Sequence, residues 1–164
     1  IFETERLIVR KLIKEDVTAF HEMQSNPKVM QYATGIVKCF SEHKTELDNL
    51  IAKYSEIDNS FWIYGIERKH DHVFIGTVAL VKEGVNDEIG YRFLEKYWSN
   101  GYGTEVCTGL ISYCRIKGFE KLIAYVVDDN IVSAKILKRL GFQFVKKQIA
   151  EDLQLPETKF ELIL

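Results

Sequence analysis

The chain has 164 residues, which suits one domain, so a single domain over residues 1–164 is expected. Hydrophobic residues make up 46% of it and charged residues 28%, a profile that excludes a disordered chain. The formal net charge of -2 favours neither nucleic acid nor an anionic membrane as a partner. No apolar run approaches the roughly 18 residues that span a bilayer. We therefore expect a cytoplasmic protein with no nucleic-acid or membrane partner.

Cysteine usage also indicates a reducing compartment. The three cysteines, Cys39, Cys107 and Cys114, form an odd and sparse set that argues against a disulfide framework. Cys107 and Cys114 fall on one face of a predicted helix roughly 10 Å apart, too far for a disulfide. We interpret both as core residues rather than nucleophiles, because free cysteine is usually buried and neither has a histidine near it in the sequence.

The first third of the chain is predicted to hold one strand and two or three helices. Alternating apolar residues favour a strand over 2–13, and acidic residues then open a helix over 14–23. A short helical piece is expected over 28–32. Ser41 is interpreted as the cap of a clearer helix, without a full capping box, whose apolar stripe ends near Glu56.

Three strands follow as a meander. Aromatic and β-branched residues predict strands over 60–67 and 74–82, with polar turns between and after them. Gly76, inside the second of these strands, indicates a bulge or a close approach of another backbone. The third strand is expected over 88–93.

The second half adds two helices and three strands. A helix over 104–117 carries an inward apolar face, with Gly109 allowing close packing on a sheet and Gly118 ending the helix. A largely apolar strand over 121–127 is typical of a central position in a sheet. The remaining elements are a helix over 132–140 and strands over 142–149 and 158–164.

This order of elements predicts an α+β (mixed α/β) fold. Antiparallel hairpins combine with one right-handed strand–helix–strand crossover. The expected architecture is a central mixed, mostly antiparallel sheet of about seven strands with helices on both faces. A dinucleotide-binding Rossmann fold is disfavoured, because strands and helices do not alternate throughout the chain.

A glycine-rich loop before the helix of the crossover is predicted to bind phosphate. Gly101 and Gly103 flank Tyr102 where the helix should start, so backbone N–H groups can approach a ligand with no Cβ in the way. The helix N-terminus adds unpaired N–H groups and a partial positive charge. A Walker loop is disfavoured, because Thr104 and Glu105 follow Gly103 instead of Lys-Ser/Thr. A phosphorylated cofactor is the working hypothesis.

Several motifs then stand at a specific spacing along nearly the whole chain. They are Glu5-Arg6-Leu7-Ile8-Val9-Arg10 with Glu15-Asp16, Glu88-Ile89-Gly90-Tyr91 with Tyr97 to Glu105, and Asn130 to Ala134 with Lys138 to Phe142. In these motifs and in its order of elements the chain resembles the GNAT superfamily of N-acetyltransferases. Within it, the chain is similar to the RimJ/RimL-like subgroup, whose namesakes acetylate ribosomal-protein N-termini.

The resemblance implies an acetyl-CoA-dependent N-acetyltransferase that moves an acetyl group directly to a primary amine. The acceptor would be a protein N-terminal amine or a small-molecule amine such as a polyamine, an amino sugar or an antibiotic. No metal is implied, and the histidines of segment 70–72 lie in a predicted turn without a third ligand. Homodimers are common in such families, although the sequence reveals no interface. The alternative is a non-catalytic acyl-CoA-binding or regulatory module on the same fold.

The resemblance also assigns roles to residues. Glu88 would be the base that takes the proton of the amine, and Ser133 the proton donor to the departing thiolate. Backbone amides around Arg92 and Phe93 would bind the oxyanion, and Asn130 would bind or orient the pantetheine arm. The implied cofactor-binding set is Arg92, Phe93, Leu94, Ser99, Asn100, Gly101, Tyr102, Gly103, Thr104, Asn130 and Ser133.

Two departures from the family pattern matter. Trp98 stands where the superfamily loop has Gln or Arg, so the pyrophosphate would depend on the backbone amides of residues 100–104. Leu137 stands where many members carry a tyrosine that protonates the thiolate, which leaves Ser133 as the candidate. Plainer alternatives stay open: Glu88 as an exposed strand carboxylate, Ser133 as a helix cap and Asn130 as a turn residue.

Overall fold

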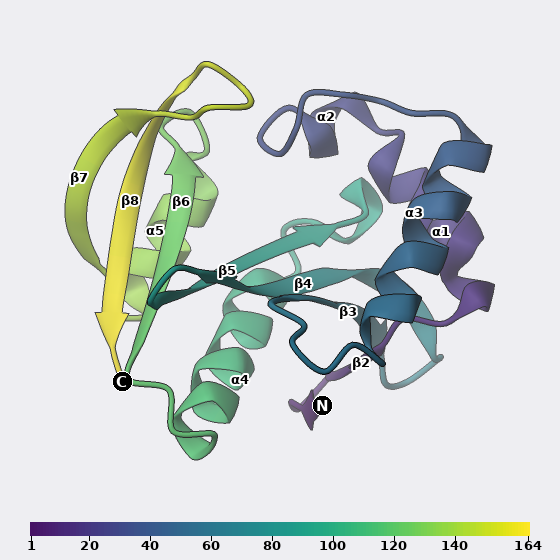
Figure 1. The fold of residues 1–164 in the computed structure, drawn as a ribbon, viewed down its shortest axis with the longest axis horizontal. Coiled ribbons are helices and arrows are strands. Elements are labelled where there is room, and N and C mark those ends of the chain that lie inside the picture. Colours follow the sequence, from purple (N-terminus) through teal and green to yellow (C-terminus); the bar gives the residue numbers. More distant parts are fainter.

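One sheet organises the protein. The computed structural model describes residues 1–164, apart from the side chain of Glu83. Its strands are β1 (Phe2–Glu3), β2 (Leu7–Lys11), β3 (Phe61–Arg68), β4 (Val73–Glu83), β5 (Asn86–Phe93), β6 (Lys121–Val127), β7 (Gln143–Ile149) and β8 (Pro156–Ile163). Its helices are α1 (Val17–Gln24), α2 (Pro27–Met30), α3 (Phe40–Lys53), α4 (Tyr102–Ile116) and α5 (Ile131–Arg139), with 3-10 turns η1 (Lys14–Asp16) and η2 (Glu95–Tyr97). The strand order is β1-β2-β3-β4-β5-β6-β8-β7. Figure 1 shows α1 and α3 on one face of this sheet and α4 on the other.

The predicted fold class is confirmed, with eight strands instead of about seven. The expectation of one strand over 2–13 is wrong, because Thr4 N–H donates to Leu7 O at 2.9 Å and the chain folds back as a β1–β2 hairpin. Apolar alternation runs through this turn and does not mark it. A Cβ added to Gly109 on α4 would lie 2.6 Å from Phe2 Cε2, so the predicted close packing at Gly109 is confirmed, with β1 as its partner.

The start of α3 differs from the prediction. The helix begins at Phe40 and its N-cap is Cys39, not Ser41. The carboxylate of Glu42 accepts a hydrogen bond from the Cys39 N–H at 2.8 Å. This acid completes the capping box that is missing when Ser41 is taken as the cap.

The backbones of β4 and β5 lie very close at Gly76. The β3–β4 register shifts between Ile66 and Glu67, opposite Gly76, which confirms the predicted bulge. A Cβ added to Gly76 would overlap the carbonyl oxygen of Arg92 on β5. Both features that the sequence predicts here, the bulge and the close approach, are therefore present.

β5 and β6 run parallel and pair at their first residues, with α4 as the crossover. Their pairs are Asp87 with Leu122 and Glu88 with Ile123. Farther along, β5 stays paired with β4 and β6 stays paired with β8, so the two strands separate (Figure 1). We call the region between residues 89–93 of β5 and residues 124–127 of β6 the strand gap.

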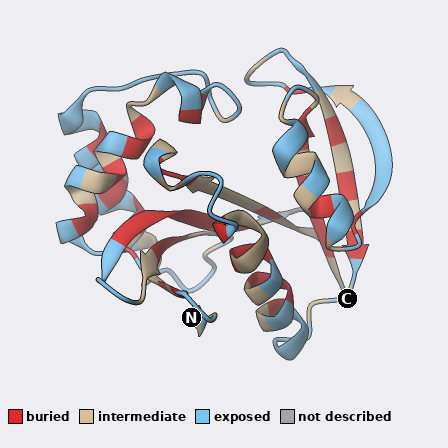
Figure 2. Ribbon diagram, turned by 180° about the vertical axis from the view of Figure 1, so that it is seen from behind, coloured by how far each residue is buried: buried red, intermediate tan, exposed pale blue. Residues whose placement is uncertain are grey.

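The core lies in two layers. One buried cluster, which includes Cys107 and Cys114, lies between the sheet and α4, and the other surrounds Phe20 and Leu47 beneath α1 and α3. Figure 2 shows the buried residues along the sheet and the inward sides of the helices. Burial raises the pKa of Cys107 and of Cys114 to about 12, so both thiols pack uncharged as the sequence predicts. Within the part of the chain that the structure describes, every helix is too short or too polar to cross a membrane.

A histidine pair joins α1 to α3. His21 Nδ1 lies 2.8 Å from His43 Nδ1, so one ring must donate and the other accept. His43 is 1% exposed, and burial lowers its pKa while Glu46 opposes that shift. Protonation of both rings would remove the acceptor, so the pair requires at least one neutral ring.

Gly76→Ala is expected to lower the free energy of unfolding by roughly 1–3 kcal/mol, because the added methyl group would push the β4 and β5 backbones apart. Urea unfolding followed by circular dichroism measures the change. Gly90→Ala is the matched control on the same two strands, since its Cβ would meet only Ala79 Cβ, at 3.8 Å. Equal losses for the two variants would contradict a backbone clash at Gly76.

The stability of the protein should fall as the pH decreases below about 6.5, the ordinary histidine pKa. The pKa of His43 is lowered in the folded state, so the unfolded chain binds more protons there. The contribution of neutral His43 to the free energy of unfolding is fully present above the ordinary histidine pKa. It is lost as the pH decreases toward the lowered pKa that His43 has in the folded protein. Thermal unfolding at about pH 7.5 and about pH 5.5 should show a smaller loss for His43→Gln than for the wild type. An identical loss would exclude His43 as the source.

Candidate active site

β5 presents two different faces where it leaves β6. Side chains alternate along a strand, so Tyr91 and Phe93 point to one side of the sheet and Glu88, Gly90 and Arg92 to the other. We call these sides the α4 face and the α1 face, after the helices that they meet. The predicted base, Glu88, therefore lies on the α1 face.

Two contacts identify those helices. The ring of Phe93 lies 6.3 Å from the ring of Tyr102 in the first turn of α4. On the opposite side, Arg92 Nη1 donates to Gln24 Oε1 at the end of α1, at 3.0 Å. The side chain of Arg92 thus points away from the predicted phosphate loop.

The backbone amides of β5 are divided between two directions. Leu94 N–H donates to Ile75 O on β4 at 3.0 Å, and the N–H groups of a strand alternate in direction. The amide of Arg92 therefore faces β4, whereas the amides of Tyr91 and Phe93 face the strand gap. The sheet therefore takes up the amide of Leu94, and by alternation that of Arg92, whereas the amide of Phe93 is directed into the strand gap.

The loop before α4 has an irregular backbone held by side chains. Ser99 and Gly101 have φ values of 62° and 80°, and Gly101 is the N-cap of α4. Asn100 Nδ2 donates to the carbonyls of Tyr97 and Trp98, at 3.1 and 2.9 Å. The side chain of Asn100 therefore fixes the loop, which leaves ligand contact to the backbone.

Three amides open α4. Glu105 N–H donates to Gly101 O at 3.1 Å and makes the first bond of the helix. The amides of Tyr102, Gly103 and Thr104 precede it and have no acceptor within the helix. They lie at the positive end of the helix dipole, so this donor set fits a phosphate group.

The N-terminus of the chain anchors this loop, which sequence reasoning missed. Arg6 Nη2 lies 2.6 Å from Glu105 Oε2, and Arg6 Nη1 donates to Asn100 O at 3.1 Å. Thr4 Oγ1 donates to Glu105 Oε1 at 2.6 Å. Burial raises the pKa of Glu105, but the bonds from Thr4 and Arg6 outweigh burial and lower the pKa overall. The only signal in the sequence is that Arg6 and Glu105 belong to two motifs of the same family.

α5 meets β5 across the strand gap. Tyr91 Oη donates to Ser133 Oγ at 3.1 Å, and burial raises the pKa of Tyr91, so the phenol stays protonated. Asn130 is the N-cap of α5, and its Oδ1 accepts from the Ser133 N–H at 3.2 Å. The cap is therefore Asn130, not Ser133, and the Ser133 hydroxyl contacts Tyr91. Sequence reasoning missed Tyr91, although its place in the strand puts it on the same face as Phe93.

The two departures from the family pattern have structural counterparts. Trp98 Nε1 donates to Phe93 O at 3.0 Å, which ties the loop to the end of β5. Leu137 is 2% exposed and packs in the core beneath α5, so no hydroxyl replaces the family tyrosine at that point.

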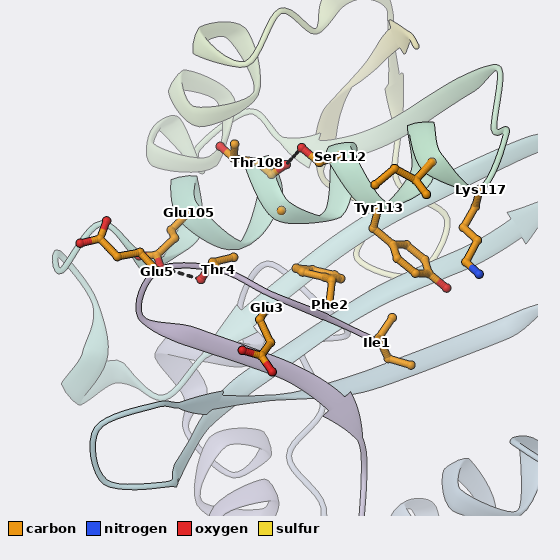
Figure 3. A pocket seen from close by; sticks show the side chains of 12 residues that line it. Ile1, Phe2, Glu3, Thr4, Glu5, Glu105, Thr108, Ser112, Tyr113 and Lys117 are labelled. Atoms are coloured by element: carbon orange, nitrogen blue, oxygen red, sulfur yellow. Dashed lines mark hydrogen bonds between the residues drawn. The ribbon is translucent and has the colours of Figure 1, made fainter.

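A surface groove lies on another side of α4. Its volume is about 920 Å³, and its walls come from β1 and α4, with Phe2, Thr4 and Tyr113 among the side chains that Figure 3 shows. The strand gap and the Tyr91–Ser133 pair do not line it. We therefore do not assign the active site to this groove.

The histidines of segment 70–72 have carboxylate partners. His72 Nδ1 lies 2.6 Å from Glu67 Oε1, and His70 Nε2 lies 3.5 Å from Asp71 Oδ2. Among the side chains that the structure describes, no group of three or more His, Cys, Asp or Glu residues could hold a metal ion.

Comparison with known proteins identifies the family. The family described as "Acetyltransferase (GNAT) domain" matches residues 6–143. The chain therefore belongs to the GNAT family of acetyltransferases, and it is an acyltransferase. YoaA of Bacillus subtilis, an uncharacterized N-acetyltransferase, is 32% identical over 148 residues, which cover 87% of this chain and 82% of YoaA.

Solved structures share the fold. RimL, the ribosomal L7/L12 α-N-protein acetyltransferase, in complex with coenzyme A, superposes with a TM-score of 0.84 at 16% identity, covering 98% of this chain and 96% of RimL. Spermidine N-acetyltransferase from Vibrio cholerae, in complex with CoA and spermine, gives a TM-score of 0.81 at 17% identity, covering 96% and 95%. At these identities the likeness concerns the fold.

Tyr91→Phe should lower the turnover rate roughly fivefold, because Ser133 Oγ loses a hydrogen bond worth about 1 kcal/mol. Acetyl-CoA affinity, measured by calorimetry, should change little. Tyr113→Phe is the matched control, since Tyr113 lies on α4 beside Phe2, outside the strand gap. An unchanged rate in Tyr91→Phe would remove this hydroxyl from the site.

Proposed function

We propose that the protein transfers an acetyl group from acetyl-CoA to a primary amine by direct attack. One observation carries the proposal: Glu88 lies on the α1 face of the strand gap, while the Tyr91–Ser133 pair lies on the α4 face beside the opening amides of α4. This arrangement suits the aminolysis of a thioester. It places a base on one side of the gap, and a proton donor and a phosphate-binding site on the other.

The N-terminus of α4 would hold the pyrophosphate of the cofactor. The amides of Tyr102, Gly103 and Thr104 supply donors, supported by the loop from Ser99 to Gly101. Because Trp98 carries no charge, this binding would rest on the backbone.

Glu88 would act as the base. An alkylamine with a pKa of about 10.4 is mostly protonated at neutral pH, and only its neutral form attacks a carbonyl carbon. Glu88 would remove that proton directly or through water. When bound, acetyl-CoA supplies an activated thioester carbonyl and a thiolate leaving group.

Groups in the strand gap and on its α4 face would stabilise the negative charge that develops on oxygen and sulfur during that attack. The amides of Tyr91 and Phe93, directed into the strand gap, would donate to the developing oxyanion. Ser133 would deliver its hydroxyl proton toward the departing sulfur. The Tyr91 hydroxyl, which donates to Ser133 Oγ, would stabilise the oxygen left behind, and Asn130 would orient Ser133 through its backbone N–H.

The acceptor would be a protein N-terminal amine or a small-molecule amine. RimL and spermidine N-acetyltransferase act on acceptors of these two classes and share this fold, so the fold does not choose between them. The buried Leu137 in place of a tyrosine favours the alternative of a non-catalytic acyl-CoA-binding module. The hydroxyls of Tyr91 and Ser133 weigh against that alternative.

Glu88→Gln should lower the rate of thiol release from acetyl-CoA roughly 100-fold at pH 7, because the amide cannot accept the proton. The rate should recover partly at high pH, where the amine loses its proton without help. Asp87→Asn is the matched control, since Asp87 is the adjacent residue on β5 and points to the opposite face. An unchanged rate in Glu88→Gln would exclude Glu88 as the base.

A panel of amines tests the function itself. Peptides with free N-termini, polyamines and amino sugars serve as acceptors in the same thiol-release measurement. Tight acetyl-CoA binding without turnover on any amine would favour the non-catalytic module. Absence of acetyl-CoA binding would contradict both hypotheses.

A further inference from the structure

Arg92 is a charged side chain of the α1 face that the proposed mechanism does not use. It is partly buried, and its Nη1 donates to Gln24 Oε1 at 3.0 Å. A guanidinium carries five N–H donors, and only one of those of Arg92 has a protein partner among the described residues. Among the described residues, Asn59 Nδ2 is the side-chain nitrogen that is fully buried and has no hydrogen-bond partner. The nitrogens of Arg92 that lack a partner are therefore not fully buried, and their N–H groups reach accessible surface.

Arg10 on β2 shows how this protein satisfies an arginine that serves structure. Its guanidinium lies 2.8 Å from Asp16 Oδ1 and 2.6 Å from Glu67 Oε2. Buried charges are normally paired in this way, because removing them from water is costly. Arg92, by contrast, has no carboxylate within ion-pair distance among the described residues, and its one bond goes to a neutral amide.

The two carboxylates that attract the charge of Arg92 are already engaged. Glu46 accepts from Gln24 Nε2 at 3.1 Å and from Lys38 Nζ at 2.8 Å. Asp152 is exposed, and its Oδ1 accepts from the next backbone amide at 2.8 Å. Burial lowers the pKa of Arg92, and the attractions of Glu46 and Asp152 only partly oppose that shift. The positive charge of Arg92 is therefore not neutralised by a direct contact.

The sheet surface between Glu88 and Arg92 has open space at Gly90. Gly90 lies between them on the same face, and a Cβ added there would meet only Ala79 Cβ, at 3.8 Å. The Cα atoms of Glu88 and Arg92 are about 13 Å apart along the strand. An acceptor can therefore lie along β5 with one end at each of these side chains.

We propose that Arg92 is a specificity-determining residue that binds an oxyanion, a carboxylate or a phosphate, of the acceptor. A guanidinium can bind either group with two parallel N–H bonds. The inference rests on the proposed function, and it narrows the acceptor to amines that carry an oxyanion several bonds from the reacting nitrogen. Dipeptide-sized molecules fit this separation better than single α-amino acids, and polyamines lack the anion.

Matched acceptor pairs test the proposal in the thiol-release measurement. The pairs are alanyl-alanine with its amide, and 4-aminobutyl phosphate with 4-aminobutanol. In the wild type, the KM of the charged member of at least one pair should be roughly 10–100-fold lower than that of the uncharged member, as expected for a charged hydrogen-bonded contact. The pair that shows the preference identifies the oxyanion as a carboxylate or a phosphate.

Two variants should then move the preference in opposite directions. Arg92→Gln should abolish it by raising the KM of the charged member, with the kcat of the uncharged member retained. Asp152→Asn keeps an oxygen for the neighbouring amide and removes a negative charge near Arg92, so it should lower the KM of the charged member. If Arg92→Gln does not fold, Arg92→Lys keeps the positive charge but cannot form two parallel N–H bonds, so it should give an intermediate preference.

Equal KM values for charged and uncharged acceptors in the wild type would overturn the proposal. Equal changes for both members in Arg92→Gln would also overturn it and would leave Arg92 as a structural tie to α1. If no amine is acetylated, calorimetry on the CoA-bound protein measures the same pairs. An Arg92-dependent preference in binding would then support the proposal while contradicting acetyl transfer, and equal binding would contradict the proposal.

Discussion

The separation of β5 from β6 after Glu88 is the constraint on which the rest of this structure depends. Parallel strands that stayed paired would bond the amides of Tyr91 and Phe93 within the sheet. Because β5 remains with β4 and β6 remains with β8, those amides face the strand gap instead. The crossover helix α4 begins at Tyr102, whose ring lies 6.3 Å from that of Phe93 at the end of β5, so the helix N-terminus lies near the open end of the gap.

The two-residue period of the strand then distributes the chemistry. Along β5, residues whose side chains lie on the α1 face direct their amides to β4, and residues on the α4 face direct theirs to the gap. One strand thereby supplies the carboxylate of Glu88 and the guanidinium of Arg92 on one side. It supplies the hydroxyl of Tyr91 on the other side, and two amides directed into the strand gap in the plane of the sheet. Insertion of one residue would exchange these roles, which makes the β4–β5 register a chemical requirement.

Local patterns in the sequence predicted most of the elements and the fold class, and the resemblance of its motifs to a known family predicted the family. Apolar periodicity and loop motifs act over a few residues, and most elements lie where they indicate. The hairpin at Thr4 escaped prediction because alternation continues through its turn. The contacts of Tyr91 with Ser133 and of Arg6 with Glu105 join residues 42 and 99 positions apart, and no local pattern reports such pairs.

The Arg6–Glu105 contact affects how the loop before α4, the candidate phosphate-binding site, reaches its conformation. The loop itself is a short motif, yet its shape depends on side chains from the first residues of the chain. Its formation therefore requires closure of a loop of about a hundred residues, at an entropic cost that a purely local motif does not carry. Transplanting the Gly-Tyr-Gly loop into another scaffold would transfer its sequence but not the contacts from Thr4 and Arg6. The conformation of the loop therefore depends on the folded chain as a whole.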